Sequence, residues 1–412
     1  MARFLAYTSP ATGHLFPLVP GLLALQAHGH QVLLIGPREH LDDVIDAGVD
    51  ARPMDPRVSA IETDDYAAAK KDRLHRGITN LMARGEYERA DLARAILEFE
   101  PDALLIDVNA YGAATEAERS GLPWATIMPS LFAYPGKGIP AYGLGMKPMG
   151  GLLGRVRDAF FTKLVVKMYG RAMLPRLNEL RVDAGLRMYR NVLEHTHSPD
   201  RMLVLTGDPL EYPRTDAPEH VRFVGAQIWD PPAEAPEWLL EDGDPWVLVT
   251  CSTAYQGDEL LAAAAIEALR DEPVRVIVTL ADASRGAEDL PQADNVRIER
   301  FVPHGPVLER AAAVICHGGM GIVQKAIAAQ VPIVAVPFGR DQPEVGRRIA
   351  ESGTGVLLKQ KDLSKLRSAY REARALRPAA RLSGGPAMFA SAAEELVPAG
   401  LELEAHDRSL IG

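Results

Sequence analysis

The chain has 412 residues, and 45 Lys and Arg against 55 Asp and Glu give it a formal net charge of −10. This length predicts two or three domains, and a composition of 47% hydrophobic and 24% charged residues excludes a disordered chain. The acidic balance argues against nucleic-acid binding, which requires clustered Lys and Arg to neutralise phosphates.

The cysteines and the apolar runs indicate the cellular compartment of the protein. Cys251 and Cys316 are too few for a disulfide framework and too far apart for a metal-binding pair. The apolar stretch near the N-terminus contains two prolines, and no run approaches the roughly 18 apolar residues of a membrane-spanning helix. We therefore expect a soluble, cytoplasmic protein without a targeting or integral membrane segment.

The first half of the chain alternates short apolar runs with helical patterns. The expected elements are strands at residues 3–8, 31–36, 103–107 and 124–128, and helices at 15–28 and 113–120. A strand, a helix and a further strand make a βαβ unit, and such units imply a parallel sheet covered by helices.

Residues 151–190 stand apart as a basic segment, with nine basic and three acidic side chains. Apolar residues recur among them at near-helical spacing. Three interpretations stay open: an amphipathic helix pair packed on the first domain, a site for an acidic or membrane-associated acceptor, and an oligomer interface.

Proline and acidic residues fill the stretch from residue 223 to 244, which has little periodicity and is typical of a linker. A second series of units follows, with strands at 246–250, 274–280, 296–301, 314–316 and 333–336 and helices at 258–269 and from 321 onwards. The predicted fold class is α/β, with two Rossmann-like domains in tandem. We place the first domain at 1–221, the linker at 222–244, the second domain at 245–382, and a C-terminal helix and tail at 383–412.

Several common nucleotide-binding and catalytic motifs are absent from the sequence. Residues 9–14, after the first strand, contain one glycine in place of G-x-G-x-x-G, which argues against a dinucleotide site. P-loop, G-x-S-x-G, HExxH and EF-hand patterns are also missing. His195 and His197 do not suit a helical metal pair, and we expect them to be solvated loop residues.

Two polar residues lie where strands of the first domain end. His14 is in the turn after the first strand, and Asp107 is the last residue of the strand at 103–107. Ligands of open α/β sheets bind at this carboxyl edge, where a histidine can act as a general base. A carboxylate bonded to one imidazole nitrogen would fix the tautomer and stabilise the imidazolium. Each residue also suits a structural role, as a helix-start histidine or a turn aspartate.

A glycine-rich turn lies between the strand at 314–316 and the helix that follows it. Residues 317–321 read His-Gly-Gly-Met-Gly. Such a turn presents backbone N–H groups and the positive end of the helix dipole, which suits a diphosphate. His317 could add a donor, and the turn at Ser252 and Thr253 could hold the other side of a phosphate. Tight strand–helix turns alone would also explain the glycines.

In this order and spacing, the motifs resemble those of the macrolide-glycosyltransferase-like branch of the UDP-glycosyltransferase superfamily. The matching stretches, spread over nearly the whole chain, are the turn at His14, Asp107, FVGAQIWDPP from residue 223, Ser252-Thr253, FVPH at 301–304, HGGMG at 317–321 and VPFGRDQ ending at Asp341-Gln342. The resemblance implies the GT-B fold, two domains around a cleft, with the final helix crossing back to the first domain.

The resemblance also implies an activity and the residues that perform it. Such enzymes transfer a sugar, with inversion, from a TDP- or UDP-sugar to a small acceptor, here a polyketide or aromatic natural product. His14 would be the general base, assisted by Asp107. The implied donor-site residues are Ser252, Thr253, Val302, His317, Gly318, Gly319, Gly321, Lys325, Asp341 and Gln342. No metal and no cofactor besides the nucleotide-sugar co-substrate is expected, and the expected partners are these two substrates, with a homodimer left open.

The chain departs from the family pattern mainly at the donor side. Ile322 and Val323 stand where small residues are usual, Lys325 replaces a ribose-binding glutamate, His304 replaces a glutamine and Cys251 a glycine. Lysine has no acceptor for ribose hydroxyls, although it could reach a phosphate. Two alternatives to an active natural-product enzyme therefore stay open: a catalytically silent auxiliary protein, and a lipid glycosyltransferase that uses the segment 151–190 at a membrane surface.

Overall fold

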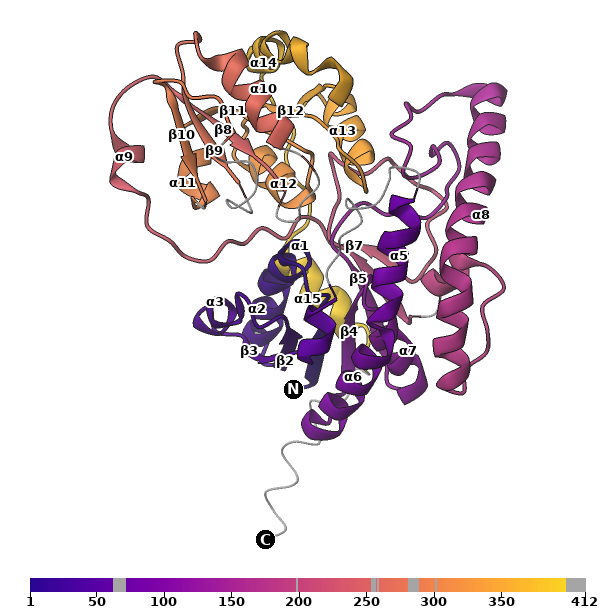
Figure 1. The fold of residues 1–412 in the computed structure, drawn as a ribbon. Helices are drawn as coiled ribbons and strands as arrows, with labels where there is room; N and C mark the ends of the chain where they lie inside the picture. The colour runs from indigo at the N-terminus through magenta and orange to yellow at the C-terminus, as the bar shows by residue number, and fades with distance from the viewer. Residues whose placement is uncertain are drawn as a thin grey trace.

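The computed structural model describes residues 1–61, 72–197, 199–252, 257, 259–280, 289–300 and 302–397, and these form two α/β domains (Figure 1). The first is built on a seven-stranded sheet of order β3-β2-β1-β4-β5-β6-β7, and the second on a six-stranded sheet of order β10-β9-β8-β11-β12-β13. All strand pairs in both sheets are parallel. The predicted fold class of two tandem Rossmann-like domains is confirmed.

The N-terminal domain contains the elements up to β7. Its strands are β1 (Arg3–Tyr7), β2 (Gln31–Gly36), β3 (Asp50–Pro53), β4 (Ala103–Asp107), β5 (Trp124–Met128), β6 (Arg201–Val204) and β7 (Val221–Phe223). Its helices are α1 (Thr12–Leu15), the 3-10 turn η1 (Phe16–Leu18), α2 (Val19–Ala27), α3 (Leu41–Asp46), α4 (Pro56–Ser59), α5 (Arg73–Ala83), α6 (Gly85–Phe99), α7 (Tyr111–Ser120), α8 (Gly151–Asp183) and the 3-10 helix η3 (Val192–His197). β4 and β5 are buried at every position, because helices cover both faces of a parallel sheet.

The C-terminal domain repeats this alternation with shorter helices. Its strands are β8 (Trp246–Thr250), β9 (Arg275–Thr279), β10 (Val296–Glu299), β11 (Ala311–Cys316), β12 (Ile333–Ala335) and β13 (Gly355–Leu357). Its helices are α9 (Glu237–Leu240), α10 (Glu259–Leu269), α11 (His304–Leu308), α12 (Met320–Ala328), α13 (Gln342–Glu351), η4 (Gln360–Lys365), α14 (Leu366–Ala375) and α15 (Pro386–Glu394). The short α9 interrupts the linker, and Leu239 within it is buried in the core of this domain.

The strand registers determine which loops meet. Tyr7 at the end of β1 lies beside Ile106 in β4, and Thr250 at the end of β8 lies beside Cys316 in β11. Consequently the loops after β1 and β4 gather at one edge of the first sheet, and those after β8 and β11 gather at one edge of the second. Ligands of open parallel sheets bind at such edges.

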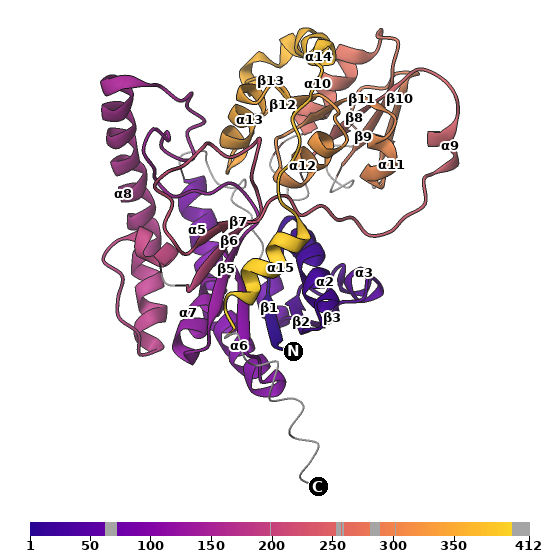
Figure 2. The same ribbon diagram turned by 180° about the vertical axis from the view of Figure 1, so that it is seen from behind.

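The chain returns to the N-terminal domain at its end (Figure 2). Gly384 forms an antiparallel bridge with Gly225, and α15 then packs against α2, where Phe389 lies directly over Gly21. Phe389 is fully buried in the core cluster of the first domain. The last described helix therefore belongs to the first core, although its sequence follows the second domain.

Gly384→Ala should destabilise the protein by about 2 to 5 kcal/mol. Gly384 has φ +74, and a Cβ there would overlap the carbonyl oxygen of Val224, so a left-handed backbone penalty and a steric penalty add. The matched control is Gly121→Ala, because Gly121 has φ +73 and no atom within 4 Å of its Cβ position. Urea unfolding measures both, and equal losses in the two variants would refute the steric role of Gly384.

Residues 151–183 of the basic segment form a single helix, so the interpretation of the segment as a helix pair is wrong. α8 continues through Pro175 to Asp183. A proline removes one helical hydrogen bond and usually kinks or ends a helix, but here Met173 and Leu177 on both sides of it are buried in a cluster shared with α5. Tertiary packing of these neighbours holds the helix together across the proline.

Two further expectations are corrected. His195 is not a solvated loop residue: it lies in η3 with its ring 5.1 Å from that of Tyr111, and burial, followed by the charge of Arg181, lowers its pKa to about 4. His197 ends the same 3-10 helix. The linker expected from residue 222 starts later, since β7 extends to Phe223.

Candidate functional site

His14 and Asp107 are in direct contact at the edge of the first sheet. His14 Nδ1 lies 2.7 Å from Asp107 Oδ2, and the other carboxylate oxygen accepts the backbone N–H of Asn109 at 2.9 Å. A carboxylate only accepts hydrogen bonds, so Nδ1 carries the proton and Nε2 holds the lone pair. The side-chain amide of Asn109 lies 3.3 Å from Nε2. The imidazole is therefore fixed at both nitrogens.

The local backbone explains how His14 comes to this position. The sequence predicted a turn there, but α1 begins at Thr12, one residue after an extended Ala11, and His14 lies in its last turn. Asp107 ends β4 and its side chain is fully buried, whereas that of His14 is 23% exposed. The carboxylate is thus shielded from water, while the imidazole remains accessible.

Two opposing effects act on the pKa of His14, and the net result is a raised value. Burial lowers the pKa, but the charge and hydrogen bond of Asp107 and the charge of Asp341 together outweigh it. Stabilising the imidazolium in this way makes the imidazole a stronger base than an isolated histidine.

Asp341 belongs to the C-terminal domain but lies at the same site. It precedes α13 and accepts a hydrogen bond from the Ser130 hydroxyl, which follows β5 of the N-terminal domain. Burial raises the pKa of Tyr142, and the charges of Asp341 and Glu344 raise it further. The Tyr142 hydroxyl also hydrogen-bonds to Ser130. The edges of the two sheets therefore face each other, with His14 on one side and Asp341 on the other.

The glycine-rich turn surrounds a buried imidazole. His317 follows β11, and burial lowers its pKa to about 4, so it is neutral near pH 7. Its ring hydrogen-bonds to the backbone of Thr250, and its Nδ1 has no partner within the described part of the chain. Gly319 is required beside it, because a Cβ there would overlap the ring. Among the described residues, no side chain caps α12 at Gly319, so the first amides of that helix are available to an anion.

The other predicted donor-side residues occupy different surroundings. The Gln342 side-chain oxygen accepts the N–H groups of Phe338 and Gly339, at 2.8 and 3.2 Å, and so holds the turn before α13. Ser252 lies two residues after β8, and Val302 is buried in the core between β10 and α11. Thr253, predicted with them, lies outside the described residues, as does Phe301 of the FVPH stretch.

Known proteins of related sequence share this organisation. Residues 263–396 match the family described as Erythromycin biosynthesis protein CIII-like, C-terminal domain. The 4'-demethylrebeccamycin synthase of Lentzea aerocolonigenes is 31% identical over 384 residues, which are 88% of this chain and 89% of that protein. This chain belongs to the macrolide-glycosyltransferase-like branch of the UDP-glycosyltransferase superfamily. It is a glycosyltransferase.

Further relatives and solved structures agree with this assignment. The L-demethylnoviosyl transferase of Streptomyces niveus is 26% identical, over 86% of this glycosyltransferase and 85% of that protein. The kitacinnamycin glycosyltransferase structure aligns with a TM-score of 0.72 at 21% identity, covering 96% of this chain and 99% of that one. The glycosyltransferase VinC, solved with dTDP, aligns with a TM-score of 0.63 at 22% identity, covering 96% and 94%. These structures show the GT-B fold.

The structure shows where the residues that depart from the family pattern lie in this glycosyltransferase. Ile322 and Val323 are buried in the core of the C-terminal domain, not aimed into the glycine-rich turn. Lys325 forms an ion pair with Asp230 of the linker. Burial, followed by the Lys325 charge, lowers the pKa of His304 to about 4. The basic side chain at 325 therefore has a carboxylate partner inside the protein.

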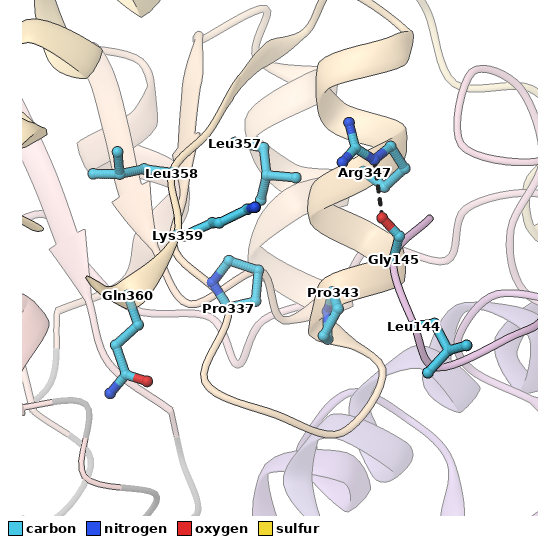
Figure 3. A pocket seen from close by; sticks show the side chains of 9 residues that line it. All are labelled: Leu144, Gly145, Pro337, Pro343, Arg347, Leu357, Leu358, Lys359 and Gln360. Carbon is cyan, nitrogen blue, oxygen red and sulfur yellow. Dashed lines mark hydrogen bonds between the residues drawn. The ribbon is translucent and has the colours of Figure 1, made fainter. Parts of the chain in front are cut away.

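The two domains of the glycosyltransferase are also joined beside the site. The backbone N–H of Gly145 donates to Glu344 at 2.7 Å, and Arg347 donates to the Gly145 carbonyl at 3.0 Å. Figure 3 shows this second bond in a pocket between the Leu144–Gly145 segment and residues around α13 and β13. Of the residues predicted for catalysis or donor binding, those that the structure describes do not line that pocket.

Sequence reasoning missed Asn109, Ser130 and Asp230 in the site of this glycosyltransferase. Asn109 and Ser130 each lie two residues after a strand of the first sheet, so the rule that located Asp107 could have found them. Asp230 lies in the linker, inside the FVGAQIWDPP stretch that carries the family resemblance, but nothing in that stretch indicates a partner at Lys325.

Proposed function

We propose that this glycosyltransferase moves a sugar from a TDP- or UDP-sugar to a hydroxyl of a small natural-product acceptor, with inversion at the anomeric carbon. The observation that carries the proposal is the contact between His14 and Asp107, in which the His14 side chain remains 23% exposed and Asp341 lies across the interface between the two domains. Such a pair provides a base for the acceptor on one side and polar contacts for the sugar on the other.

The proposed reaction is a single displacement. Nε2 of His14 takes the proton of the acceptor hydroxyl as the acceptor oxygen forms a bond to the anomeric carbon. The bond from that carbon to the diphosphate oxygen breaks, and the nucleoside diphosphate leaves with the electron pair. Asp107 stabilises the imidazolium that results. Attack opposite the leaving group inverts the configuration.

The leaving diphosphate needs stabilisation as its charge grows. We place it at the N-terminus of α12, where Gly318, Gly319 and Gly321 offer backbone amides and the helix dipole is positive. Nδ1 of His317 is the ring atom without a partner in the described residues, and a bound anion would favour its protonation. Ser252 and Thr253 would contact the opposite side of the diphosphate, and no metal is required in this scheme.

The sugar and base would lie on either side of the diphosphate. We place Asp341 and Gln342 beside the sugar hydroxyls. The backbone of Val302 would lie beside the nucleotide base. The natural-product acceptor class is supported by the relative named 4'-demethylrebeccamycin synthase.

A silent auxiliary protein is the second candidate, and one observation favours it. Asp341 is bonded to Ser130, Lys325 is paired with Asp230, and Gln342 holds a turn. The side chains proposed for the donor are thus engaged within the protein, and a donor must displace or join these contacts.

A thermal-shift titration with TDP, UDP and GDP separates the two functions. A ligand that binds only the folded state adds about 2.7 kcal/mol of stability at a hundredfold excess over Kd. We expect a shift with TDP or UDP that persists in His14→Ala, followed by sugar transfer to an aromatic acceptor in the unaltered enzyme. No shift with any nucleotide, from a folded sample, would contradict the transferase and favour the auxiliary protein.

Reversing the charge at residue 325 should weaken nucleotide binding about tenfold, which corresponds to about 1.4 kcal/mol. In Lys325→Glu, two carboxylates face each other where an ion pair now lies beside His304, and their repulsion disturbs the donor side. The double variant Asp230→Lys/Lys325→Glu rebuilds the pair with reversed polarity and should recover binding.

The matched control for this charge reversal is Lys361→Glu, which changes the net charge equally at an exposed position. Isothermal titration calorimetry with TDP and UDP measures all four proteins. If Lys325→Glu alone tightens binding, the lysine opposes the donor and the ion pair has no supporting role.

A further inference from the structure

The outward face of α8 carries large apolar side chains that the fold leaves exposed. In Figures 1 and 2 this helix stands at the edge of the N-terminal domain, away from both sheets. Six apolar side chains in its first half are between 45% and 79% exposed: Leu152, Leu153, Val156, Phe160, Leu164 and Met168. The spacing of four residues from Leu152 to Met168 places most of them along one side of the helix.

The apolar packing of α8 is confined to its second half, although Gly154 and Asp158 in the first half are buried. The cluster that joins α8 to α5 includes α8 residues from Tyr169 onwards. Residues 151–168 contribute to none of the hydrophobic clusters formed by the described residues. A contiguous exposed apolar surface of this kind is typical of an interaction site.

Basic side chains surround these apolar ones. Arg155, Lys163, Lys167 and Arg171 are exposed and make no ion pair within the described part of the chain. The acidic residue of this stretch, Asp158, is buried and paired with Arg157. The face is therefore cationic in a protein whose formal net charge is −10.

The positive charge of this face indicates which kind of partner binds to it. A second copy packed symmetrically would bring the basic set that includes Lys163, Lys167 and Arg171 against the same basic set of its partner, and no exposed acid between residues 151 and 171 would offset that repulsion. An anionic lipid surface complements both features, because Lys and Arg meet the phosphate headgroups while the apolar side chains enter the boundary of the acyl chains.

We propose that the first half of α8 docks this enzyme on the surface of an anionic lipid bilayer. Among the helices of the described residues, none is long and apolar enough to cross a bilayer, so α8 would lie on the surface. The helix begins directly after the segment in which Ser130 contacts Asp341 and Gly145 contacts Glu344. A short stretch of chain therefore connects the docked face to the site. The proposed docking itself does not depend on the transfer reaction.

Vesicle sedimentation of the full-length protein tests the docking. We expect it to sediment with vesicles of phosphatidylcholine and phosphatidylglycerol in equal parts, much less with phosphatidylcholine alone, and less as salt rises. Each basic residue near an anionic bilayer strengthens binding roughly fivefold. The triple variant Lys163→Gln/Lys167→Gln/Arg171→Gln should therefore bind roughly a hundredfold more weakly. Phe160→Ser/Leu164→Ser should also weaken binding, although it keeps every charge.

The matched control is Lys359→Gln/Lys361→Gln/Lys365→Gln, three exposed positions on the C-terminal domain that change the net charge equally. Its binding should stay at the level of the unaltered protein, and circular dichroism confirms that each variant is folded. Equal weakening in both triple variants, or no sedimentation with anionic vesicles at low salt, would overturn the proposal. So would a dimer in sedimentation velocity that Phe160→Ser/Leu164→Ser dissociates, since a second copy would then cover the face.

Discussion

His14→Ala should reduce the turnover of sugar transfer by about 10²- to 10⁴-fold while leaving the protein folded and able to bind nucleotide. General base catalysis by a positioned side chain contributes a factor of this size. The proposed nucleotide contacts, such as the amides before α12, lie in the other domain, so the loss should appear in kcat and not in nucleotide affinity. Steady-state kinetics and nucleotide titration measure the two effects separately.

The matched control is His75→Ala, which removes an exposed histidine of the same domain and should leave kcat unchanged. Thermal unfolding checks that both variants are folded. If His14→Ala retains activity within a few-fold, the proton is taken by another group or the acceptor reacts without a base, and the proposed mechanism is wrong.

Asp107→Asn should lower kcat by about 10³- to 10⁴-fold, because an amide can present its N–H to the imidazole and stabilise the wrong tautomer. It should also change the pH dependence. Burial acts to lower the pKa of His14, and the charge and hydrogen bond of Asp107 are the main effects that raise it. The base must be neutral to act, so transfer is lost as pH falls through the pKa of His14. Without the carboxylate, this acid limb should move to lower pH.

A pH–rate profile of kcat over KM for both proteins measures the shift of the acid limb. Asn109→Ala is the control, because it removes the amide that contacts Nε2 at 3.3 Å but leaves the carboxylate in place. Its acid limb should remain near that of the unaltered enzyme. An unchanged limb in Asp107→Asn would mean that the limb belongs to another group.

Local patterns in the sequence were sufficient for much of the fold. The expected strands at 31–36, 103–107, 124–128 and 246–250 agree with β2, β4, β5 and β8 at both ends. Continuous apolar runs of this length predict buried parallel strands because both faces of such a sheet are covered. The position of His14 and Asp107 followed from the same reasoning, since residues that end neighbouring parallel strands meet at one edge.

The same local reasoning failed where packing overrides it. The apolar and basic pattern of residues 151–190 suggested a helix pair, but buried neighbours on α5 hold α8 together across Pro175. The spacing of His195 and His197 suits no metal pair and predicted solvated loop residues, yet the His195 ring packs against the rings of Tyr111 and Tyr189. Periodicity describes which side of an element is apolar, and it does not say which other element covers that side.

By itself, the sequence determined the two parallel sheets, the edge of each that carries polar residues, and the glycine-rich turn before α12, because short-range stereochemistry and apolar periodicity control these features. Only the tertiary structure decided that Ser130 bonds to Asp341, that Lys325 pairs with Asp230, and that the first half of α8 remains uncovered. These contacts join residues far apart in the chain. They depend on how two separately formed domains and a long helix are placed against each other, and no local pattern in the sequence specifies that placement.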